Sequence, residues 1–137
     1  MDTILIQEKL EYLNDNIKKL EFRYNKYKNE TDELEKETLL LAISKLIEEI
    51  IESAIKINNT ILKENKDYAA SYYETFSRLT KHYGFNKKTF NELAKSTSLR
   101  NKITHEYKSI ENKILLETPN LIKLYTQYKN TIAKQFL

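Results

Sequence analysis

Apolar residues along the chain recur every three or four positions, which is the spacing of an amphipathic helix. The first such segment covers residues 4–28. Its apolar positions share one helical face, and they are Ile6, Leu10, Leu13, Ile17, Leu20 and Tyr24. Asp2 or Thr3 can cap its start, because a short polar side chain there accepts a hydrogen bond from a free backbone N–H. We therefore predict a first helix that ends before the polar break at residues 29–31.

The second segment is the longest apolar part of the chain and runs from Thr31 or Asp32 to about Lys66. Two apolar rows lie side by side along it. The main row contains Leu39, Ile43, Leu46, Ile50, Ala54, Ile57 and Ile61, and the second contains Leu40, Ile47, Ile51 and Leu62. Two rows are more than one neighbouring helix covers, so this helix either lies at the centre of the fold or presents one row to another subunit.

Polar residues and the only glycine set the boundaries of a third helix. Residues 65–67 form a polar break, after which Asp67 or Ser71 can start the helix. Ser71-x-x-Glu74 has the capping-box pattern, in which two side chains satisfy free N–H groups at a helix start. Gly84 fits the left-handed position that commonly follows a helix, so we predict that this helix ends at the residue before it.

Two further boundaries follow from local sequence. Asn86 can cap a short helix that carries the apolar residues Phe90, Leu93 and Ala94. Residues 96–98, Ser-Thr-Ser, predict a weak point or a new helix start. Thr118 and Pro119 have the pattern of an N-cap followed by the first helical residue, which predicts a last helix over about residues 120–136.

These segments predict an all-α protein. We expect an up-and-down bundle of four long helices and one or two short ones, as a single domain over residues 1–137. Composition agrees, because one glycine and one proline leave little room for a turn-rich β fold. Hydrophobic residues are 40% and charged residues 31%, a balance typical of amphipathic helices around one core.

Charge and cysteine usage restrict the classes of function. The net charge is only +3, so any contact with nucleic acid should be local rather than spread along a basic groove. The absence of cysteine excludes a disulfide framework and a thiolate zinc site. The chain has ten tyrosines and no tryptophan, and in a helical protein most tyrosines fill the edge of the core. No long uncharged segment occurs, so we expect a cytoplasmic protein with no membrane contact.

Residues 99–107, Leu-Arg-Asn-Lys-Ile-Thr-His-Glu-Tyr, combine an apolar edge with a set of reactive polar groups. In a helix with ~100° per residue, Leu99, Ile103 and the following Ile110 fall on one narrow side. A continuous polar arc covers the other side, in the order Tyr107, Arg100, Thr104, Asn101 and His105. The edge can bury in a bundle while the arc presents a phenol, a cation, a hydroxyl, an amide and an imidazole. Such groups on one rigid helix predict a functional site.

This arc resembles the R-polar-x-x-x-H motif of HEPN domains, with Arg100, Asn101 and His105 at the motif positions. Tyr107, two residues after the histidine, extends the resemblance to the HepT branch of that superfamily. Members of that branch are toxins of two-gene systems in which the antitoxin is a minimal nucleotidyltransferase. The full pattern Arg-Asn-x-x-x-His-x-Tyr is far more specific than Arg and His at that spacing alone.

The resemblance also covers the order of elements along the chain. A long apolar helix at Leu39–Leu62 comes first, then Tyr72-x-x-x-Phe76, then the motif and a closing helix. Ser98-Leu99 stands where family members often have Gly-Phe, a difference that affects packing rather than chemistry. The resemblance implies a HEPN-like helical domain over the whole chain.

Cleavage of RNA without a metal requires a base for the ribose 2′-OH proton, an acid for the leaving 5′-oxygen, and positive charge beside the phosphorane. His105 can act as acid or base, because an imidazole titrates near neutrality. Arg100 can hold phosphate oxygens with paired N–H donors. Asn101, one turn before His105, can orient the ring or a phosphate, and Thr104 supports them. No cluster of His, Asp and Glu has metal-ligand spacing, so we expect neither a metal nor a cofactor.

The resemblance implies two further features. HEPN ribonucleases build their site at a two-fold dimer interface, which here would place two copies of His105 and Arg100 in one cleft. In HepT-like systems the cognate nucleotidyltransferase antitoxin transfers AMP to the motif tyrosine, which Tyr107 matches. Negative charge and bulk beside Arg100 would then close the cleft. These features describe the toxin of a type VII-like toxin–antitoxin system, a homodimer that cleaves RNA.

Other interpretations of the same residues stay open. Related helical bundles with the same motif have been viewed as non-catalytic substrate-binding subunits of minimal nucleotidyltransferases. An arginine and a histidine on one helix are also commonly surface or capping residues, and Tyr107 then only packs at an interface. Glu48, Glu49 and Glu52 predict a solvated or salt-bridged patch, with a contact to Arg100 as the alternative. His82 lies outside the motif, and we interpret it as a helix C-terminal residue favoured by the dipole.

Overall fold

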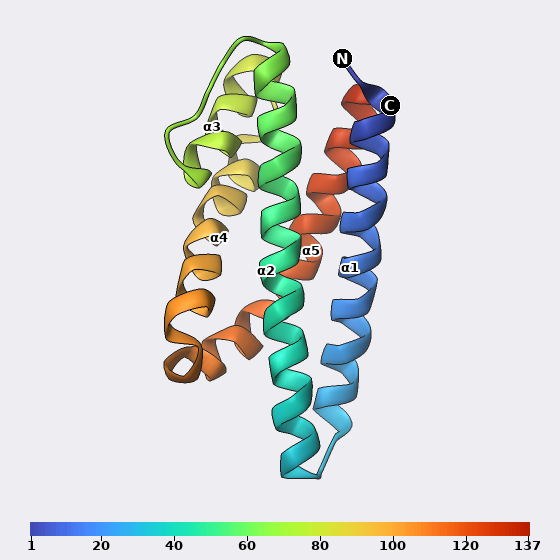
Figure 1. Ribbon diagram of the computed structural model, residues 1–137, viewed down its shortest axis with the longest axis vertical. Helices are drawn as coiled ribbons and strands as arrows, with labels where there is room; N and C mark the ends of the chain where they lie inside the picture. The colour runs from blue at the N-terminus through green and yellow to red at the C-terminus, as the bar shows by residue number, and fades with distance from the viewer.

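The computed structural model describes residues 1–137 and consists of helices without strands. In chain order the helices are α1 (Thr3–Asn29), α2 (Glu33–Glu64), α3 (Tyr72–Tyr83), α4 (Lys87–Glu106), the 3-10 helix η1 (Tyr107–Ile110) and α5 (Glu111–Phe136). Figure 1 shows α1, α2 and α5 along the long axis, with α3 and α4 on one side of α2 and the two termini at the same end. The predicted all-α helical bundle is confirmed.

The predicted helix starts are confirmed wherever a short polar side chain caps them. Each of these side chains accepts a hydrogen bond from a backbone N–H in the first turn, and the residues are Asp2, Asp32, Ser71 and Asn86. Gly84 ends α3 with φ at 65°, and its N–H donates to the Thr80 carbonyl at 2.8 Å. A side chain would be strained in that left-handed region, which explains the glycine at this position.

The expected break at residues 96–98 is wrong, because α4 is one continuous helix across them. The hydroxyls of Ser96, Thr97 and Ser98 each donate to the backbone carbonyl three residues earlier, so they are satisfied inside the helix. Buried residues before and after the serines, Leu93 and Leu99, keep both halves packed on the core. Tertiary packing therefore overrides a weak local preference.

The expected start of the last helix at Thr118 is also wrong. α5 begins at Glu111 and contains Pro119 in its interior. A proline there removes one backbone hydrogen bond and costs ~3 kcal/mol or more, usually with a kink. Figure 1 shows the first turns of α5 tilted against the rest of the helix. Ile114 and Leu121 are buried on either side of the proline, and this burial offsets the lost hydrogen bond.

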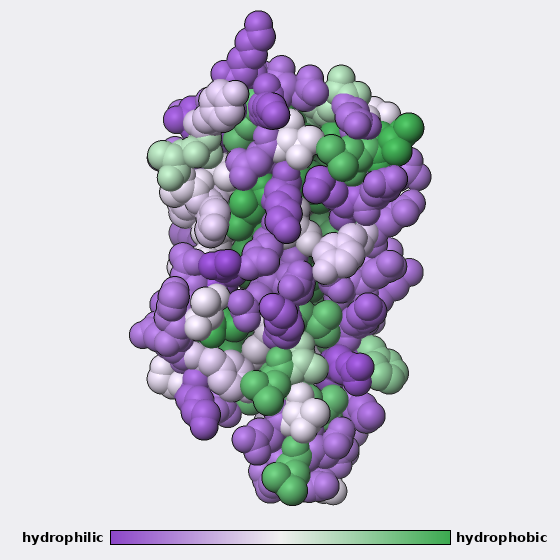
Figure 2. All heavy atoms as spheres, viewed as in Figure 1, coloured by the Kyte–Doolittle hydropathy of each residue, from purple (hydrophilic) through white to green (hydrophobic).

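α2 is the central helix and packs against α1, α3, α4 and α5. Both of its apolar rows are buried by these neighbours, apart from the half-buried Leu46. Of the two interpretations of the rows, the central helix is therefore confirmed, and no complete row is left for another subunit. On the face drawn in Figure 2, hydrophobic side chains appear in small separate groups among hydrophilic ones. No helix has the length and apolar content of a membrane span.

The loop between α2 and α3 is fixed to α3 by one carboxylate. Asp67 accepts a hydrogen bond from Arg78 Nη1 at 2.9 Å, and its other oxygen lies 2.8 Å from His82 Nε2. The hydrogen bond to His82 is the main reason that the pKa of Asp67 lies below its ordinary value. His82 lies in the last turn of α3, as predicted, so its position is explained without a role in the motif.

Candidate functional site

The motif side chains on α4 face a row of carboxylates on α2. Arg100 donates to Glu52 Oε1 from Nη2 at 2.7 Å and from Nε at 3.0 Å. One turn further along α4, the Thr104 hydroxyl lies 3.0 Å from Glu48 Oε2. Because the residue number falls on α2 as it rises on α4, the two helices run antiparallel here. The pairing fixes the rotation of α4 and therefore the direction in which the remaining motif residues point.

Arg100 is held from three sides. Besides Glu52, the Asn101 side-chain oxygen accepts from Arg100 Nη1 at 3.3 Å, and the guanidinium lies 5.7 Å from the ring centre of Tyr72. The hydrogen bond to Glu52 is the main reason that the pKa of Arg100 lies above its ordinary value. A guanidinium has five N–H donors, and the contacts named here use three of them. The free donors can hold an anion such as a phosphate.

The contact between Arg100 and an acidic residue of α2 was only the alternative in the sequence analysis, and the structure confirms it for Glu52. Glu49 differs from Glu52, because it accepts from the Tyr12 hydroxyl at 3.1 Å and pairs with Lys45 at 3.4 Å. Glu48 and Glu52 therefore contact the motif, whereas Glu49 belongs to the surface of α1 and α2. Sequence alone showed that they share a helix but not which helix each one faces.

His105 lies on the exposed side of α4 and makes no side-chain hydrogen bond or ion pair. It follows Asn101 by four positions, so both side chains lie on the same face of the helix, one turn apart. Asn101 is also exposed, whereas Leu99 and Ile103 are buried as the apolar edge. The imidazole is thus open to a ligand from solvent. No group of three or more His, Cys, Asp or Glu side chains is placed to hold a metal ion.

Tyr107 does not lie beside Arg100, so that part of the predicted arc is wrong. α4 ends at Glu106, and Tyr107 begins the tighter helix η1. Its phenol is near Ser44 of α2, two turns or ~12 Å along that helix from Glu52. It lines a separate hollow with Tyr27, Glu37, Glu111 and their neighbours. Burial is the main reason that the pKa of Tyr107 lies above its ordinary value, and the charge of Glu111 adds to it.

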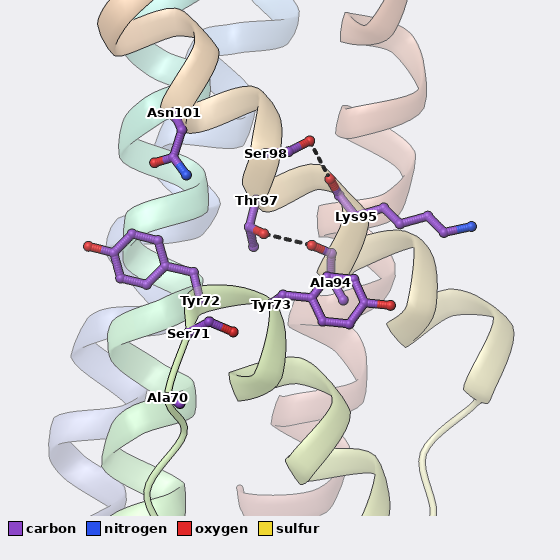
Figure 3. Close-up of a pocket in the computed structure, with 9 residues that line it drawn as sticks. All are labelled: Ala70, Ser71, Tyr72, Tyr73, Ala94, Lys95, Thr97, Ser98 and Asn101. Carbon is purple, nitrogen blue, oxygen red and sulfur yellow. Dashed lines mark hydrogen bonds between the residues drawn. The ribbon is translucent and has the colours of Figure 1, made fainter.

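An open cavity of about 640 Å³ adjoins the motif between the start of α3 and the middle of α4. We call it the Tyr72 cavity, and its lining residues are Ala70, Ser71, Tyr72, Tyr73, Ala94, Lys95, Thr97, Ser98 and Asn101. Figure 3 shows Tyr72 and Tyr73 at the start of α3 with their rings pointing to opposite sides, next to the α4 residues. No sequence pattern predicted this cavity. A possible signal was the adjacent Tyr72 and Tyr73 after a helix cap, together with small residues on one face of α4.

Replacing Glu52 with alanine should destabilise the fold slightly more than replacing Glu49. The side chains of Arg100 and Glu52 are only 23% and 30% exposed, so the loss of this ion pair leaves a partly buried guanidinium without its acceptor. We expect a loss of about 1 kcal/mol for Glu52→Ala. Glu49→Ala is the matched control, because both of its partners, Lys45 and the Tyr12 hydroxyl, lie on the exposed surface. Thermal unfolding followed by circular dichroism measures both, and equal midpoints would contradict a structural role for the pair.

The comparisons with known proteins agree with one another. A protein-family model described as ribonuclease HepT-like matches residues 13–130. The tri-AMPylated HEPN toxin of Shewanella oneidensis, solved in complex with an MNT antitoxin, has a TM-score of 0.81 and 19% identity, covering 98% of this chain and 98% of that chain. The chain matches no curated protein at a significant level.

Two substituted forms of a toxin–antitoxin MntA–HepT structure are also similar in fold. The form with two aspartate-to-glutamate substitutions has a TM-score of 0.80 and 19% identity, covering 94% of this chain and 97% of that chain. The form with one tyrosine-to-alanine substitution has a TM-score of 0.64 and 19% identity, covering 89% and 98%. At this identity the solved structures establish the fold alone, whereas the family match covers most of the chain.

Proposed function

The chain belongs to the HepT-like ribonuclease family, and we propose that it is the toxin of a type VII-like toxin–antitoxin system that cleaves RNA in the cytoplasm without a metal. The observation that carries this proposal is the arrangement of Arg100 and His105. The guanidinium is fixed by Glu52 with N–H donors to spare, and the imidazole stands exposed on the same helix. A phosphate held at the first group lies within one or two helical turns of the second.

The proposed reaction is attack of a ribose 2′-oxygen on the adjacent phosphorus. The 2′-OH loses its proton to a base, the new O–P bond closes a 2′,3′-cyclic phosphate, and the bond to the 5′-oxygen breaks as an acid protonates that oxygen. An imidazole can fill either role near neutral pH. Arg100 neutralises the charge that develops on the phosphorane, and Asn101 holds the guanidinium in place. Thr104 positions α4 through Glu48.

We propose that a second copy of the chain completes the site. One chain offers a single free imidazole, because His82 lies in the last turn of α3 against Asp67. A two-fold axis beside α4 would bring two copies of His105 and Arg100 together, so that one imidazole acts as base and the other as acid. The exposure of His105 supports this arrangement. The apolar rows of α2 do not, since the chain buries them itself.

Light scattering at micromolar concentration should therefore give twice the chain mass of 16.4 kDa. A mixing experiment tests whether the dimer shares one site. Adding an excess of His105→Ala protein to the wild type should lower cleavage per wild-type chain, because mixed dimers lack one imidazole. A monomer in solution, or cleavage unchanged by mixing, would refute the composite site.

The test of the function itself is purified protein incubated with RNA in EDTA. We expect cleavage to continue, with products that end in a 2′,3′-cyclic phosphate, and growth arrest when the chain is expressed alone. Strict dependence on Mg²⁺ would count against the proposal. RNA or nucleotide binding without any cleavage would instead favour a non-catalytic subunit of a nucleotidyltransferase.

We also propose that the partner is a cognate minimal nucleotidyltransferase, the antitoxin, which silences the toxin by transferring AMP to Tyr107. The support is the position of Tyr107 two residues after His105 and the family to which the chain belongs. The solved relative from Shewanella oneidensis is a tri-AMPylated toxin bound to an MNT antitoxin.

A further inference from the structure

We infer that the Tyr72 cavity binds an unpaired nucleobase of the RNA, next to the phosphate held by Arg100. This inference rests on the proposed ribonuclease function and adds the class of substrate, which is single-stranded RNA. It is carried by the shape of the cavity, the chemistry of its lining and its contact with the motif.

The shape of the cavity fits a flat group. Its volume of about 640 Å³ lies in the usual range for small-molecule sites. The α4 side is built from small residues, Ala94, Thr97 and Ser98, so a planar ring can approach the helix closely. The α3 side carries Tyr72 and Tyr73, which are 44% and 43% exposed. A base stacked on Tyr72 would remove part of this aromatic surface from water.

The polar atoms of the cavity can contact the edge of a base. Asn101 uses its side-chain oxygen to accept from Arg100, so its NH₂ group is the one left for a ligand. In Figure 3 the Asn101 nitrogen lies on the side of the Tyr72 ring. The Ser98 hydroxyl donates to the Lys95 carbonyl at 3.0 Å and keeps its lone pairs as acceptors. The lining of the cavity therefore includes a donor from Asn101 and an acceptor from Ser98.

The cavity and the catalytic groups lie in order along α4. The Arg100 guanidinium lies 5.7 Å from the centre of the Tyr72 ring, so a base stacked near Tyr72 has its own phosphate within reach of Arg100. His105 follows Asn101 by one turn, ~6 Å along the helix axis. Base, phosphate and imidazole would thus follow one another along the same helix.

The base must be unpaired for this mode of binding. In an RNA duplex both faces of a base are stacked on neighbours and its pairing edge is occupied, so proteins contact mainly the backbone and the 2′-hydroxyls. An aromatic surface that accepts one ring is useful only for a base that has left the stack. The small net charge of +3 agrees, since a binding mode that relies on stacking needs fewer phosphate contacts.

The test measures binding rather than cleavage, with the full chain carrying His105→Ala so that the RNA stays intact. The probe is a short single-stranded RNA with one fluorescent 2-aminopurine, compared with the same strand in a duplex and with a strand containing abasic positions. We expect Tyr72→Ala to weaken binding of the single strand by about 5- to 100-fold. Tyr72→Phe should bind like the parent, because it keeps the ring. The duplex and the abasic strand should bind more weakly than the single strand.

Two further variants distinguish a loss of binding from a folding defect. Tyr68→Ala is the matched control, because Tyr68 is 73% exposed and does not line the cavity. Ser98→Phe fills the cavity from an exposed position and should weaken binding as Tyr72→Ala does. The inference fails if Tyr72→Ala and Ser98→Phe bind as tightly as the parent, or if the duplex binds as tightly as the single strand. Tyr72-dependent binding by a wild type that cleaves no RNA would refute the proposed function and leave this inference standing.

Discussion

Replacing His105 with alanine should lower the rate of RNA cleavage by about 10²- to 10⁴-fold, which is the usual effect of removing a positioned acid or base. The free energy of unfolding should hardly change. His105 is exposed and makes no side-chain hydrogen bond, and surface substitutions of this kind usually change the free energy of unfolding by less than ~0.5 kcal/mol. Cleavage assays and thermal unfolding on the same preparation separate a loss of chemistry from a loss of structure.

Substitutions of Arg100 test the phosphate-binding part of the same site. Arg100→Lys keeps a positive charge but loses the planar fork that contacts Glu52 and leaves N–H donors for phosphate. We expect it to lose most of the activity that Arg100→Ala loses. Glu106→Ala is the control, because Glu106 is exposed beside His105 but lies off the polar arc. Full cleavage by His105→Ala, or a melting temperature that falls together with the activity, would contradict the assigned role.

The features that were predicted correctly from sequence depend on nearby residues. The apolar spacing of α1 and α2 follows from ~3.6 residues per turn, and the caps at Asp2, Asp32 and Asn86 act within the first turn of each helix. The two boundary errors have the opposite origin. Locally, residues 96–98 and Pro119 disfavour a continuous helix. Buried residues on either side of each keep α4 and α5 continuous.

The features of the site also divide into those that local sequence predicts and those that depend on distant residues. Periodicity correctly placed Asn101 and His105 on the exposed side of a helix whose apolar edge is buried, whereas Arg100 lies partly buried against α2. It could not identify Glu52 as the partner of Arg100, because the two are 48 positions apart in the chain. The Tyr72 cavity likewise arises from the packing of α3 on α4, which no local pattern encodes. Tyr107 was misplaced because the extrapolated helix ends one residue before it.

The corrected position of Tyr107 changes what is expected of its modification. In the proposed transfer, the phenol oxygen would attack the α-phosphorus of ATP, an O–P bond would form, pyrophosphate would leave, and the phenol proton would go to a base. An ordinary phenol is already protonated at neutral pH, and burial raises the pKa of Tyr107 further, so we expect the partner enzyme to remove the proton. Tyr107 is partly buried where it lines the hollow with Tyr27 and Glu37, so we expect η1 to shift before the transfer.

Once formed, the adduct should add charge and bulk to the end of α4 that carries His105, rather than beside Arg100. The Tyr107 phenol lies near Ser44 of α2, two turns of that helix away from Glu52, which pairs with Arg100. Each nucleotide brings a negative charge and a bulky group to the end of α4. Both would hinder the approach of an RNA phosphate to the imidazole, one by repulsion and the other by occupying space.

Co-expression of the chain with its cognate nucleotidyltransferase should therefore add one or more AMP groups to the intact mass and abolish RNA cleavage. Tyr107→Phe should show neither the mass change nor the silencing, because it keeps the ring and loses the phenol oxygen that accepts AMP. Tyr27→Phe is the matched control, since Tyr27 lines the same hollow, and it should still be modified and silenced. A chain that is silenced at its unmodified mass would show that the antitoxin acts by binding alone. Modification that persists in Tyr107→Phe would place the acceptor on another residue.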